Sequence, residues 1–216
     1  VAHLDQIARQ RNIPLILDGA YGLPFPNILF TDATPHWNEN TILALSLSKL
    51  GMPGIRTGII VAREDIIEAY ASANGIINLA CGNMGPAIVQ DMFRSGEILE
   101  LTRQHITPFY RQRAMDTVGW FRDSLGDVPC RIHKPEGAFF LWLWFEDLPV
   151  TSAELYQRLK ALGVLVVPGH YCFFGLEEDW PHRHECIRVS YVQDEQSVRK
   201  GVEIICDEAR RLYSAA

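Results

Sequence analysis

The sequence lacks the features that mark disulfide-stapled, membrane-spanning and nucleic-acid-binding proteins. Its five cysteines are odd in number and scattered, with no Cys-x-x-Cys pair, which argues against a disulfide framework or a structural zinc site. No apolar run reaches the roughly 18 residues that a membrane-spanning helix needs, and no basic-then-apolar signal opens the chain. A net charge of −6 without a Lys/Arg cluster favours neither nucleic acid nor an anionic membrane. We expect a cytoplasmic protein with a small-molecule partner, no nucleic-acid partner and no membrane partner.

Internal repeats, low-complexity segments and an initiating methionine are also missing. The chain opens with VAHLDQIARQRN, in which Leu4, Ile7 and Ala8 are spaced as on one face of a helix already under way. We therefore expect that a segment upstream is absent from this sequence. The 216 residues, 48% of them hydrophobic, suffice for the core of one large domain or two small ones.

The first part of the chain has the pattern of an α/β domain. Three short apolar runs without polar alternation occupy residues 13–18, 41–48 and 58–62. Such runs are typical of strands buried on both faces of a parallel sheet. The predicted domain is large enough to bind a cofactor.

The second part changes to helices and then to a smaller α+β pattern. Residues 86–125 have helical spacing, with breaks expected near Ser95-Gly96 and at Pro108. The later elements are a strand in 137–145, a helix opened by the capping box Thr151-x-x-Glu154, strands in 164–167 and 186–192, and a closing helix from about Asp194. We predict one domain over residues 1–96, connecting helices over 97–125 and a smaller α+β domain over 126–216.

A lysine with unusual neighbours lies in the stretch SLSKLGMPGIRTG, residues 46–58. Lys49 ends an apolar run, and the carboxyl ends of strands in α/β sheets face the ligand crevice. A partly desolvated lysine amine can attack a carbonyl and form a Schiff base. Ser46 and Ser48 add hydroxyl donors, and Arg56 adds a planar fork that suits phosphate oxygens. The stretch therefore predicts an amine beside an anion site.

A carboxylate is expected at the same edge of the sheet. Asp18 ends the apolar run of LILDGAYG, and Tyr21 follows three residues later. An acid at a strand end is often only a turn former, but the pairing with Lys49 favours a functional role. Pyridoxal 5'-phosphate needs a lysine for its aldehyde, a carboxylate for its ring nitrogen and donors for its phosphate. These residues supply all three.

The motifs D-x-A-Y, S-x-S-K and P-G-x-R-x-G closely resemble the fold-type I aminotransferases of class I/II, and the resemblance extends over essentially the whole chain. It implies an α/β fold with part of a large, mostly parallel-sheet domain and a small carboxyl-terminal α+β domain. It further implies that Lys49 is the Schiff-base lysine, that Asp18 partners the pyridine nitrogen and that Tyr21 donates to the phenolic oxygen. Ser46, Ser48 and Arg56 match the phosphate-binding positions of the family.

The substrate side of the site depends more heavily on the resemblance. Arg188 in HECIRVSYV matches the family arginine that binds the amino acid's carboxylate, although an edge-strand surface arginine is the plain alternative. Gly137 and the loop around Gly169 are expected to shape the amino-acid pocket. Four aromatic residues are more typical of core packing than of a ligand box: Phe139, Phe140, Trp142 and Trp144.

One cluster could in principle bind a metal. His182, His184 and Cys186 stand at alternate positions, which would share one face if they lay on a strand. No second ligand cluster is visible, and a catalytic zinc needs three protein ligands and an oriented second shell. We expect no metal site.

The resemblance also implies the reaction and its partners. Within the family, the chain is most similar to enzymes that transfer the amino group of valine to pyruvate, giving 3-methyl-2-oxobutanoate and alanine. The expected partners are an amino acid, a 2-oxo acid and, at full length, a second copy of the chain. Two alternatives remain: another fold-type I enzyme, such as a different aminotransferase or a carbon–sulfur lyase, and the aminotransferase-like effector domain of a transcription regulator.

The chain departs from the family in length, because family members are roughly twice as long. The resemblance therefore covers only their carboxyl-terminal half, and part of the active site is expected to lie outside this sequence. We expect the 216-residue chain alone to be inactive and to leave an apolar sheet edge unpaired.

Overall fold

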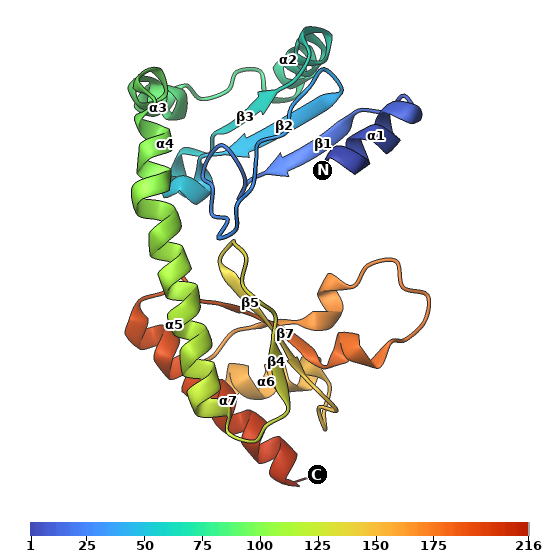
Figure 1. Ribbon diagram of the computed structural model, residues 1–216, viewed down its shortest axis with the longest axis vertical. Coiled ribbons are helices and arrows are strands. Elements are labelled where there is room, and N and C mark those ends of the chain that lie inside the picture. Colours follow the sequence, from blue (N-terminus) through green and yellow to red (C-terminus); the bar gives the residue numbers. More distant parts are fainter. Residues whose placement is uncertain (216) are drawn as a thin grey trace. The chain divides into compact units, whose positions relative to one another are not determined.

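The computed structural model describes residues 1–215 and divides the chain into two compact units, residues 1–109 and residues 110–216 (Figure 1). Each unit has its own sheet. None of the described helices is both long and apolar enough to cross a membrane. The finer predicted division, at residues 96 and 125, stays a prediction.

The first unit contains a three-stranded sheet of the order β1-β2-β3. Its strands are β1 (Leu15–Gly19), β2 (Thr41–Ser46) and β3 (Gly58–Val61). β1 pairs with β2 in parallel, and β2 pairs with β3 in antiparallel fashion. The three predicted apolar runs thus form strands, but the sheet is mixed. The arrows of β1 and β2 point the same way, so their carboxyl ends lie at the same edge (Figure 1).

The predicted burial of these strands on both faces is wrong for β1. Ile16, in the middle of that strand, is 65% exposed, and Val61 at the end of β3 is exposed as well. Within residues 1–215, one side of β1 and one side of β3 lack a paired strand. The described residues thus leave apolar side chains exposed on these strands and, separately, leave backbone groups unpaired at two sheet edges.

Helices flank this sheet. They are α1 (Ala2–Gln10), α2 (Glu64–Asn78), α3 (Met84–Ser95) and α4 (Glu97–Leu101), followed by a π-helical turn over Thr102–Ile106 and by α5 (Thr107–Leu125), most of which belongs to the second unit. The sequence pattern did not predict α2. The predicted break at Gly96 is confirmed, since this residue has a left-handed φ of 78° between α3 and α4.

The predicted break at Pro108 is wrong. A proline inside an α-helix clashes with the carbonyl four residues earlier. Here Pro108 is the second residue of α5, and the wider π-helical turn comes directly before that helix. The chain therefore remains helical, with an irregular turn in place of a break.

The core of the first unit lies under the lysine-bearing segment. Its buried members are Phe25, Leu45, Leu47, Leu50, Val89 and Ile98. The Phe25 ring meets the edge of Phe93 on α3 at a centroid distance of 5.2 Å. Because Leu47 and Leu50 are both buried, the short turn between them is anchored on either side of Lys49.

The second unit is an antiparallel sheet covered by helices. Its strand order is β4-β5-β7-β6, with β4 (Cys130–Ile132), β5 (Phe140–Phe145), β6 (Val167–Pro168) and β7 (Cys186–Ser190). α6 (Ser152–Ala161) begins at Thr151, whose hydroxyl accepts a hydrogen bond from the Glu154 backbone N–H at 3.2 Å, as the capping box predicts. β4 was not predicted.

The closing helix of the second unit is α7 (Glu195–Ala215). Its predicted apolar stripe is confirmed, because all five of its members are buried: Val198, Val202, Ile205, Ala209 and Leu212. In β5, Leu141, Leu143 and Phe145 are buried, whereas the alternate residues are only half-buried. The two faces of this strand therefore have different environments.

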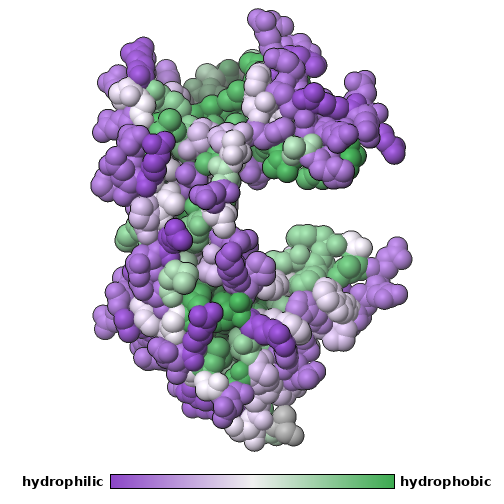
Figure 2. Space-filling model, in the orientation of Figure 1, coloured by the Kyte–Doolittle hydropathy of each residue, from purple (hydrophilic) through white to green (hydrophobic). Residues whose placement is uncertain are grey.

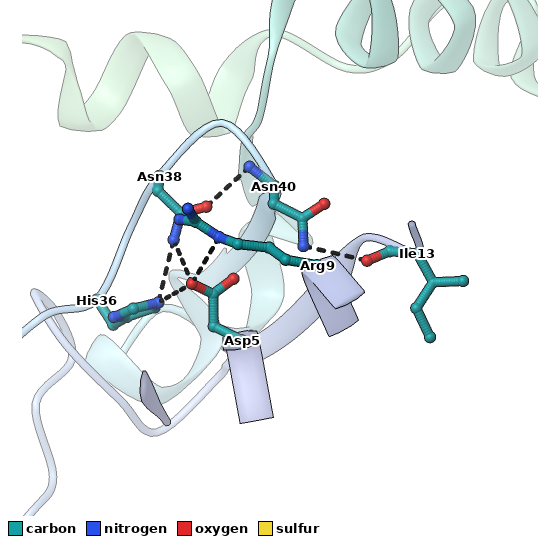
Figure 3. A network of polar contacts seen from close by, with 6 residues as sticks. All are labelled: Asp5, Arg9, Ile13, His36, Asn38 and Asn40. Carbon is teal, nitrogen blue, oxygen red and sulfur yellow. Dashed lines mark hydrogen bonds and ion pairs between the residues drawn. The ribbon is translucent and has the colours of Figure 1, made fainter. Parts of the chain in front are cut away.

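A polar network joins α1 to the loop before β2 (Figure 3). Oδ2 of the buried Asp5 accepts a hydrogen bond from Asn38 Nδ2 at 2.9 Å and pairs with Arg9 Nε at 3.0 Å. His36 Nε2 lies 3.5 Å from the same oxygen. Burial raises the pKa of Asp5, but the hydrogen bonds from Arg9 and Asn38 outweigh it and leave the pKa below its ordinary value. The carboxylate thus stays charged in the fold.

Three further hydrogen bonds carry the network to the strands. The Asn40 backbone N–H donates to Asn38 Oδ1 at 2.8 Å, and Asn40 Nδ2 donates to the Ile13 carbonyl at 3.1 Å (Figure 3). The Leu15 backbone N–H donates to the Asn40 carbonyl at 2.9 Å, next to the start of β1. Asp5 therefore helps to hold both strands that lead to the candidate site.

Replacing Asp5 by asparagine is expected to lower the melting temperature of the protein at neutral pH. The melting temperature of the variant should also fall less than that of wild type when the pH is lowered. A lowered pKa in the folded state means that the unfolded chain binds more protons, so the stabilisation is present above about pH 4 and is lost below it. The measurement is the melting temperature from about pH 7 to pH 3 for wild type and Asp5→Asn, with Asp32→Asn in an exposed loop as the control. Identical pH profiles for wild type and Asp5→Asn would contradict this role.

Candidate cofactor and substrate site

Lys49 lies just beyond the carboxyl end of β2. It occupies a 3-10 turn, Ser48–Leu50, that ends at Gly51 with a left-handed φ of 97°. Asp18 is the penultimate residue of β1 and pairs with Ala44 of β2. Because the two strands are parallel, the carboxylate and the lysine lie at the same edge of the sheet, as predicted.

Ser46, Ser48 and Arg56 form a corner of donor groups beside this lysine. The Ser48 backbone N–H donates to Ser46 Oγ at 3.2 Å, and Arg56 Nη1 donates to Ser48 Oγ at 3.4 Å. The Leu47 backbone N–H donates to the Thr57 carbonyl at 3.1 Å, which brings the two ends of the loop together. Hydroxyls and an exposed guanidinium that lie close together can donate hydrogen bonds to the oxygens of a phosphate.

Tyr21 belongs to the same group of side chains. Lys49 Nζ lies over the Tyr21 ring, 5.3 Å from its centre, which is within the range of a cation–π contact. The Ile28 backbone N–H donates to the Tyr21 carbonyl at 3.0 Å, so the segment after β1 is fixed by its own backbone. The structure therefore brings the amine and the phenol together.

Asp18 is exposed and forms a local turn. Its Oδ1 accepts a hydrogen bond from the Ala20 backbone N–H at 3.0 Å. This is the turn-forming role expected of an aspartate at a strand end. The hydrogen bond of this turn occupies one carboxylate oxygen of Asp18. The charged carboxylate can still interact with a ligand at the sheet edge.

Two hollows of the first unit lie beside this group rather than over Lys49. One of about 760 Å³, between the sheet and α2, is lined by Arg56 and Tyr70. The other, of about 680 Å³ between β3 and α3, is lined by Thr57 and Phe93. Among the described residues Lys49 lines neither hollow, so the candidate site is identified by its donor groups and not by an enclosed cavity.

Arg188 lies in the second unit, on β7, which is an interior strand of its sheet. The alternative of an edge-strand surface arginine is therefore wrong. Its register partners are Trp142 on β5 and Val167 on β6. The guanidinium carbon lies over the Phe140 ring, 4.3 Å from its centre. Its Nε is buried, and no described residue accepts a hydrogen bond from it.

The segment around Gly137 is held by a buried tyrosine. The Tyr191 hydroxyl donates to the Ala138 carbonyl at 2.5 Å, and the Tyr191 backbone N–H donates to the Phe139 carbonyl at 3.2 Å. Burial raises the pKa of Tyr191, which keeps its hydroxyl a donor. The chain after Gly137 is thereby fixed to the end of β7.

Gly169 follows β6 and packs closely on β7. A Cβ at this position would meet the Cys186 Cβ at 2.6 Å, the Cys186 carbonyl oxygen at 2.7 Å and the Arg183 carbonyl oxygen at 2.9 Å. Only glycine allows the two backbones to approach this closely. The position of the loop that starts at Gly169 thus requires a residue without a Cβ.

The loop over residues 169–185 packs aromatic rings against β5. Trp142 contacts Phe173 at a centroid distance of 5.9 Å, and Trp144 contacts His182 at 4.6 Å. Trp144 Nε1 also donates to Glu185 Oε2 at 2.7 Å. Figure 2 shows hydrophobic surface over this loop, where the side chain of Phe174 is 87% exposed. Trp142 and Trp144 therefore pack against this loop on the half-buried face of β5, and not in the core that the sequence analysis favours.

The His182–Cys186 segment does not have the geometry imagined for a metal site. Pro181–His184 forms a 3-10 turn, and only Cys186 lies on the strand. His184 Nε2 lies 2.7 Å from Asp179 Oδ1, while His182 Nε2 lies 3.6 Å from Cys186 Sγ. Burial raises the pKa of Cys186 to about 11, which disfavours the thiolate that a metal needs. No group of three potential ligands is found within residues 1–215.

Sequence reasoning missed the contact of Phe140 with Arg188. The signal in the sequence was the alternation of Phe140, Trp142 and Trp144 with leucines, which predicts that the three rings share one face of β5. That pattern indicates a face with its own contacts, but it does not identify which strand pairs with β5. The pairing joins residues almost 50 positions apart and could not be derived from local spacing.

The fold and the lysine-bearing sheet edge define the class: this is the fold of the fold-type I aminotransferases. The chain belongs to the aminotransferase class I and II family, whose model matches residues 1–205. Enzymes of this family depend in general on pyridoxal 5'-phosphate.

Among particular proteins, the chain is 52% identical over 211 residues to the valine–pyruvate aminotransferase of Escherichia coli (strain K12), covering 98% of this chain and 51% of that protein. The crystal structure of valine-pyruvate aminotransferase AvtA from Salmonella typhimurium LT2 matches it with a TM-score of 0.94 at 52% identity, covering 100% of this chain and 55% of that one. The chain thus spans about half the length of these relatives.

A more distant relative is a regulator. The HTH-type transcriptional regulator NorG of Staphylococcus aureus (strain USA300) is 26% identical over 187 residues, covering 79% of this chain and 38% of that protein. Part of this chain is therefore similar in sequence to a protein named for transcriptional regulation.

A methyl group at Gly169 is expected to destabilise the second unit. Gly169→Ala forces the loop away from β7, and overpacking of this kind costs about 1–3 kcal/mol. The matched control is Gly201→Ala on α7, where a Cβ meets nothing within 4 Å, so that variant should gain about 0.5–1 kcal/mol. Urea unfolding of both variants measures the difference, and equal midpoints for Gly169→Ala and wild type would refute the close packing.

Proposed function

We propose that this chain carries the lysine-bearing part of a pyridoxal-phosphate-dependent aminotransferase that converts valine and pyruvate to 3-methyl-2-oxobutanoate and alanine. The observation that carries the proposal is the grouping of Lys49, Tyr21, Ser48 and Arg56 at the sheet edge where Asp18 ends the neighbouring strand. The choice of valine and pyruvate is supported by the name of the 52% identical relative.

The donor set fits this cofactor. Ser46, Ser48 and Arg56 offer two hydroxyls and a guanidinium to a phosphate. The Lys49 amine is the group that would hold the aldehyde, and the Asp18 carboxylate would keep the ring nitrogen protonated. Tyr21 would donate its hydroxyl to the phenolic oxygen. When bound, pyridoxal phosphate supplies an electron sink that weakens the bonds at the substrate's Cα.

The reaction assigns two tasks to side chains of this chain. Lys49 Nζ, once neutral, accepts the proton that leaves the substrate's Cα, which is general base catalysis by a positioned amine. Arg188 binds the substrate carboxylate with its planar fork and so orients the Cα–H bond. Both valine and pyruvate carry this carboxylate, so one arginine serves both halves of the exchange.

Assembly and location follow from the family resemblance. We extend the proposal to a homodimer that works in the cytoplasm, with only small-molecule substrates as further partners. All five cysteines are free thiols, which agrees with a reducing compartment. Burial raises the pKa of Cys206 to about 12 and that of Cys130 to about 12, so these two remain protonated.

The alternatives make different predictions for turnover. An aminotransferase-like effector domain of a transcription regulator would bind an effector without exchanging amino groups, whereas a carbon–sulfur lyase would break a substrate bond without producing alanine. The 52% identity to an enzyme, against 26% to the regulator, favours the aminotransferase.

Replacing Lys49 by alanine is expected to abolish both cofactor attachment and transamination. With added pyridoxal phosphate, the full-length protein should show an absorption band near the visible edge, and valine with pyruvate should yield alanine. The variant should lose the absorption band. Its rate of transamination should fall at least about 1,000-fold, because a group that acts as nucleophile and base is removed. A wild-type protein that binds the cofactor and makes no alanine would overturn the proposed function.

Replacing Arg56 by alanine is expected to weaken cofactor binding without removing the band at saturation. A hydrogen bond to a charged partner contributes about 1.5–3 kcal/mol, so the dissociation constant should rise about 10- to 150-fold. Arg63→Ala is the matched control, because Arg63 is an exposed arginine that pairs with Asp65. A titration of the apoprotein followed by absorbance gives both constants, and equal affinity of Arg56→Ala and wild type would refute the phosphate role.

A further inference from the structure

Arg188 lies on a sheet face that it shares with aromatic side chains. It pairs directly with Trp142, and Phe140 precedes Trp142 by two residues on the same strand. Since side chains alternate along a strand, Phe140, Trp142 and Arg188 project from the same face. The other face of β5 holds the buried Leu141, Leu143 and Phe145. The arginine thus stands over an aromatic surface, apart from the aliphatic core.

The guanidinium of Arg188 contacts a ring without also pairing with an acid, unlike several other arginines of this unit. Arg131 and Arg199 also lie over tryptophan rings, but both of them, like Arg158, pair with a glutamate as well. For Arg188, no carboxylate of residues 1–215 lies within ion-pair distance, and its buried Nε lacks an acceptor there. The Phe140 ring, 4.3 Å from the guanidinium carbon, is its close electrostatic partner.

This contact leaves the donor groups of the arginine available. A guanidinium that lies over an aromatic face is attracted by the electrons of the ring, and all its N–H groups stay in its own plane. An acidic neighbour would use those N–H groups and neutralise the charge. A ring fixes the position of the plane and uses none of them. A buried donor without a partner is costly and calls for an explanation, which an incoming carboxylate supplies.

We propose that Phe140 is a positioning residue: its ring holds the Arg188 guanidinium flat so that the N–H edge receives the substrate carboxylate. The inference rests on the proposed function of Arg188 and adds a residue that acts through it. Trp142 on one neighbouring strand and Val167 on the other flank the arginine in register, which limits its lateral movement. Phe140 therefore sets the plane of the fork.

The kinetic test uses the full-length, cofactor-loaded protein with Phe140→Leu and Phe140→Tyr. Losing a cation–π contact of about 0.5–2 kcal/mol corresponds to a rise in KM of about 2- to 30-fold for both valine and pyruvate. The kcat should change less than KM, because the carboxylate contact is made both before and during the reaction and only its orienting effect on the Cα–H bond bears on kcat. Phe140→Tyr keeps a ring and should restore KM.

Three comparisons separate positioning from a general loss of structure. Isobutylamine, which is valine without its carboxylate, should react at the same rate in Phe140→Leu and wild type. Phe145→Leu, which removes a ring from the opposite face of β5, should lower stability and leave KM unchanged. In an Arg188→Lys background, which removes the planar fork, Phe140→Leu should add little to KM. A rise in KM that is equal for Phe145→Leu, or that persists with isobutylamine, would overturn the proposal.

A binding measurement keeps the proposal testable without turnover. Calorimetric titration with 3-methylbutanoate, an unreactive carboxylate of the same shape, should give a dissociation constant raised about 2- to 30-fold in Phe140→Leu and near wild type in Phe140→Tyr. If the wild-type protein binds this carboxylate through Arg188 but makes no alanine, the proposed function fails and the positioning role stands. If Phe140→Leu and wild type bind it equally, the positioning role fails whatever the activity.

Discussion

The parallel pairing of β1 with β2 is the constraint on which the candidate site depends. Only a parallel pair puts two carboxyl ends at one edge, and these ends carry Asp18 and Lys49. Buried Leu47 and Leu50 anchor the turn between them, so the lysine is fixed by the core beneath it. The antiparallel pairing of β3 with β2 places Gly58 opposite Ser46, and Arg56, two residues before Gly58, thereby reaches Ser48. One strand pairing thus positions an amine, a carboxylate and a corner of donors.

Two charged side chains, one in each unit, have opposite kinds of neighbours. At Asp5, several donors converge on one carboxylate, and the result is a lowered pKa and a structural link between α1 and the strands. At Arg188, the cation meets an aromatic ring and no described acid. The first arrangement satisfies a charge within the fold. The second leaves a buried donor without an acceptor among the described residues, as the proposed binding of a substrate carboxylate requires.

Much of this was predictable from the sequence, for local reasons. The S-x-S-K and P-G-x-R-x-G motifs lie within 13 residues, so the grouping of Ser48 and Arg56 follows from a short loop. The capping box at Thr151 and the apolar stripe of α7 are likewise local patterns. The errors concern long-range context: the exposure of Ile16 depends on which elements pack on that face of β1, and the neighbours of Arg188 depend on the order of four strands. Local rules predict a helix break at Pro108, but a π-helical turn directly before α5 lets the chain stay helical there.

The most direct test of the central claim, that Lys49 holds the cofactor, is chemical trapping. Sodium borohydride supplies a hydride that makes the bond between a lysine amine and the cofactor's aldehyde carbon permanent. After reduction and tryptic digestion, mass spectrometry should find the phosphopyridoxyl group on the peptide that contains Lys49 and on no other lysine. Attachment at another lysine, or none at all in a protein saturated with the cofactor, would contradict the account.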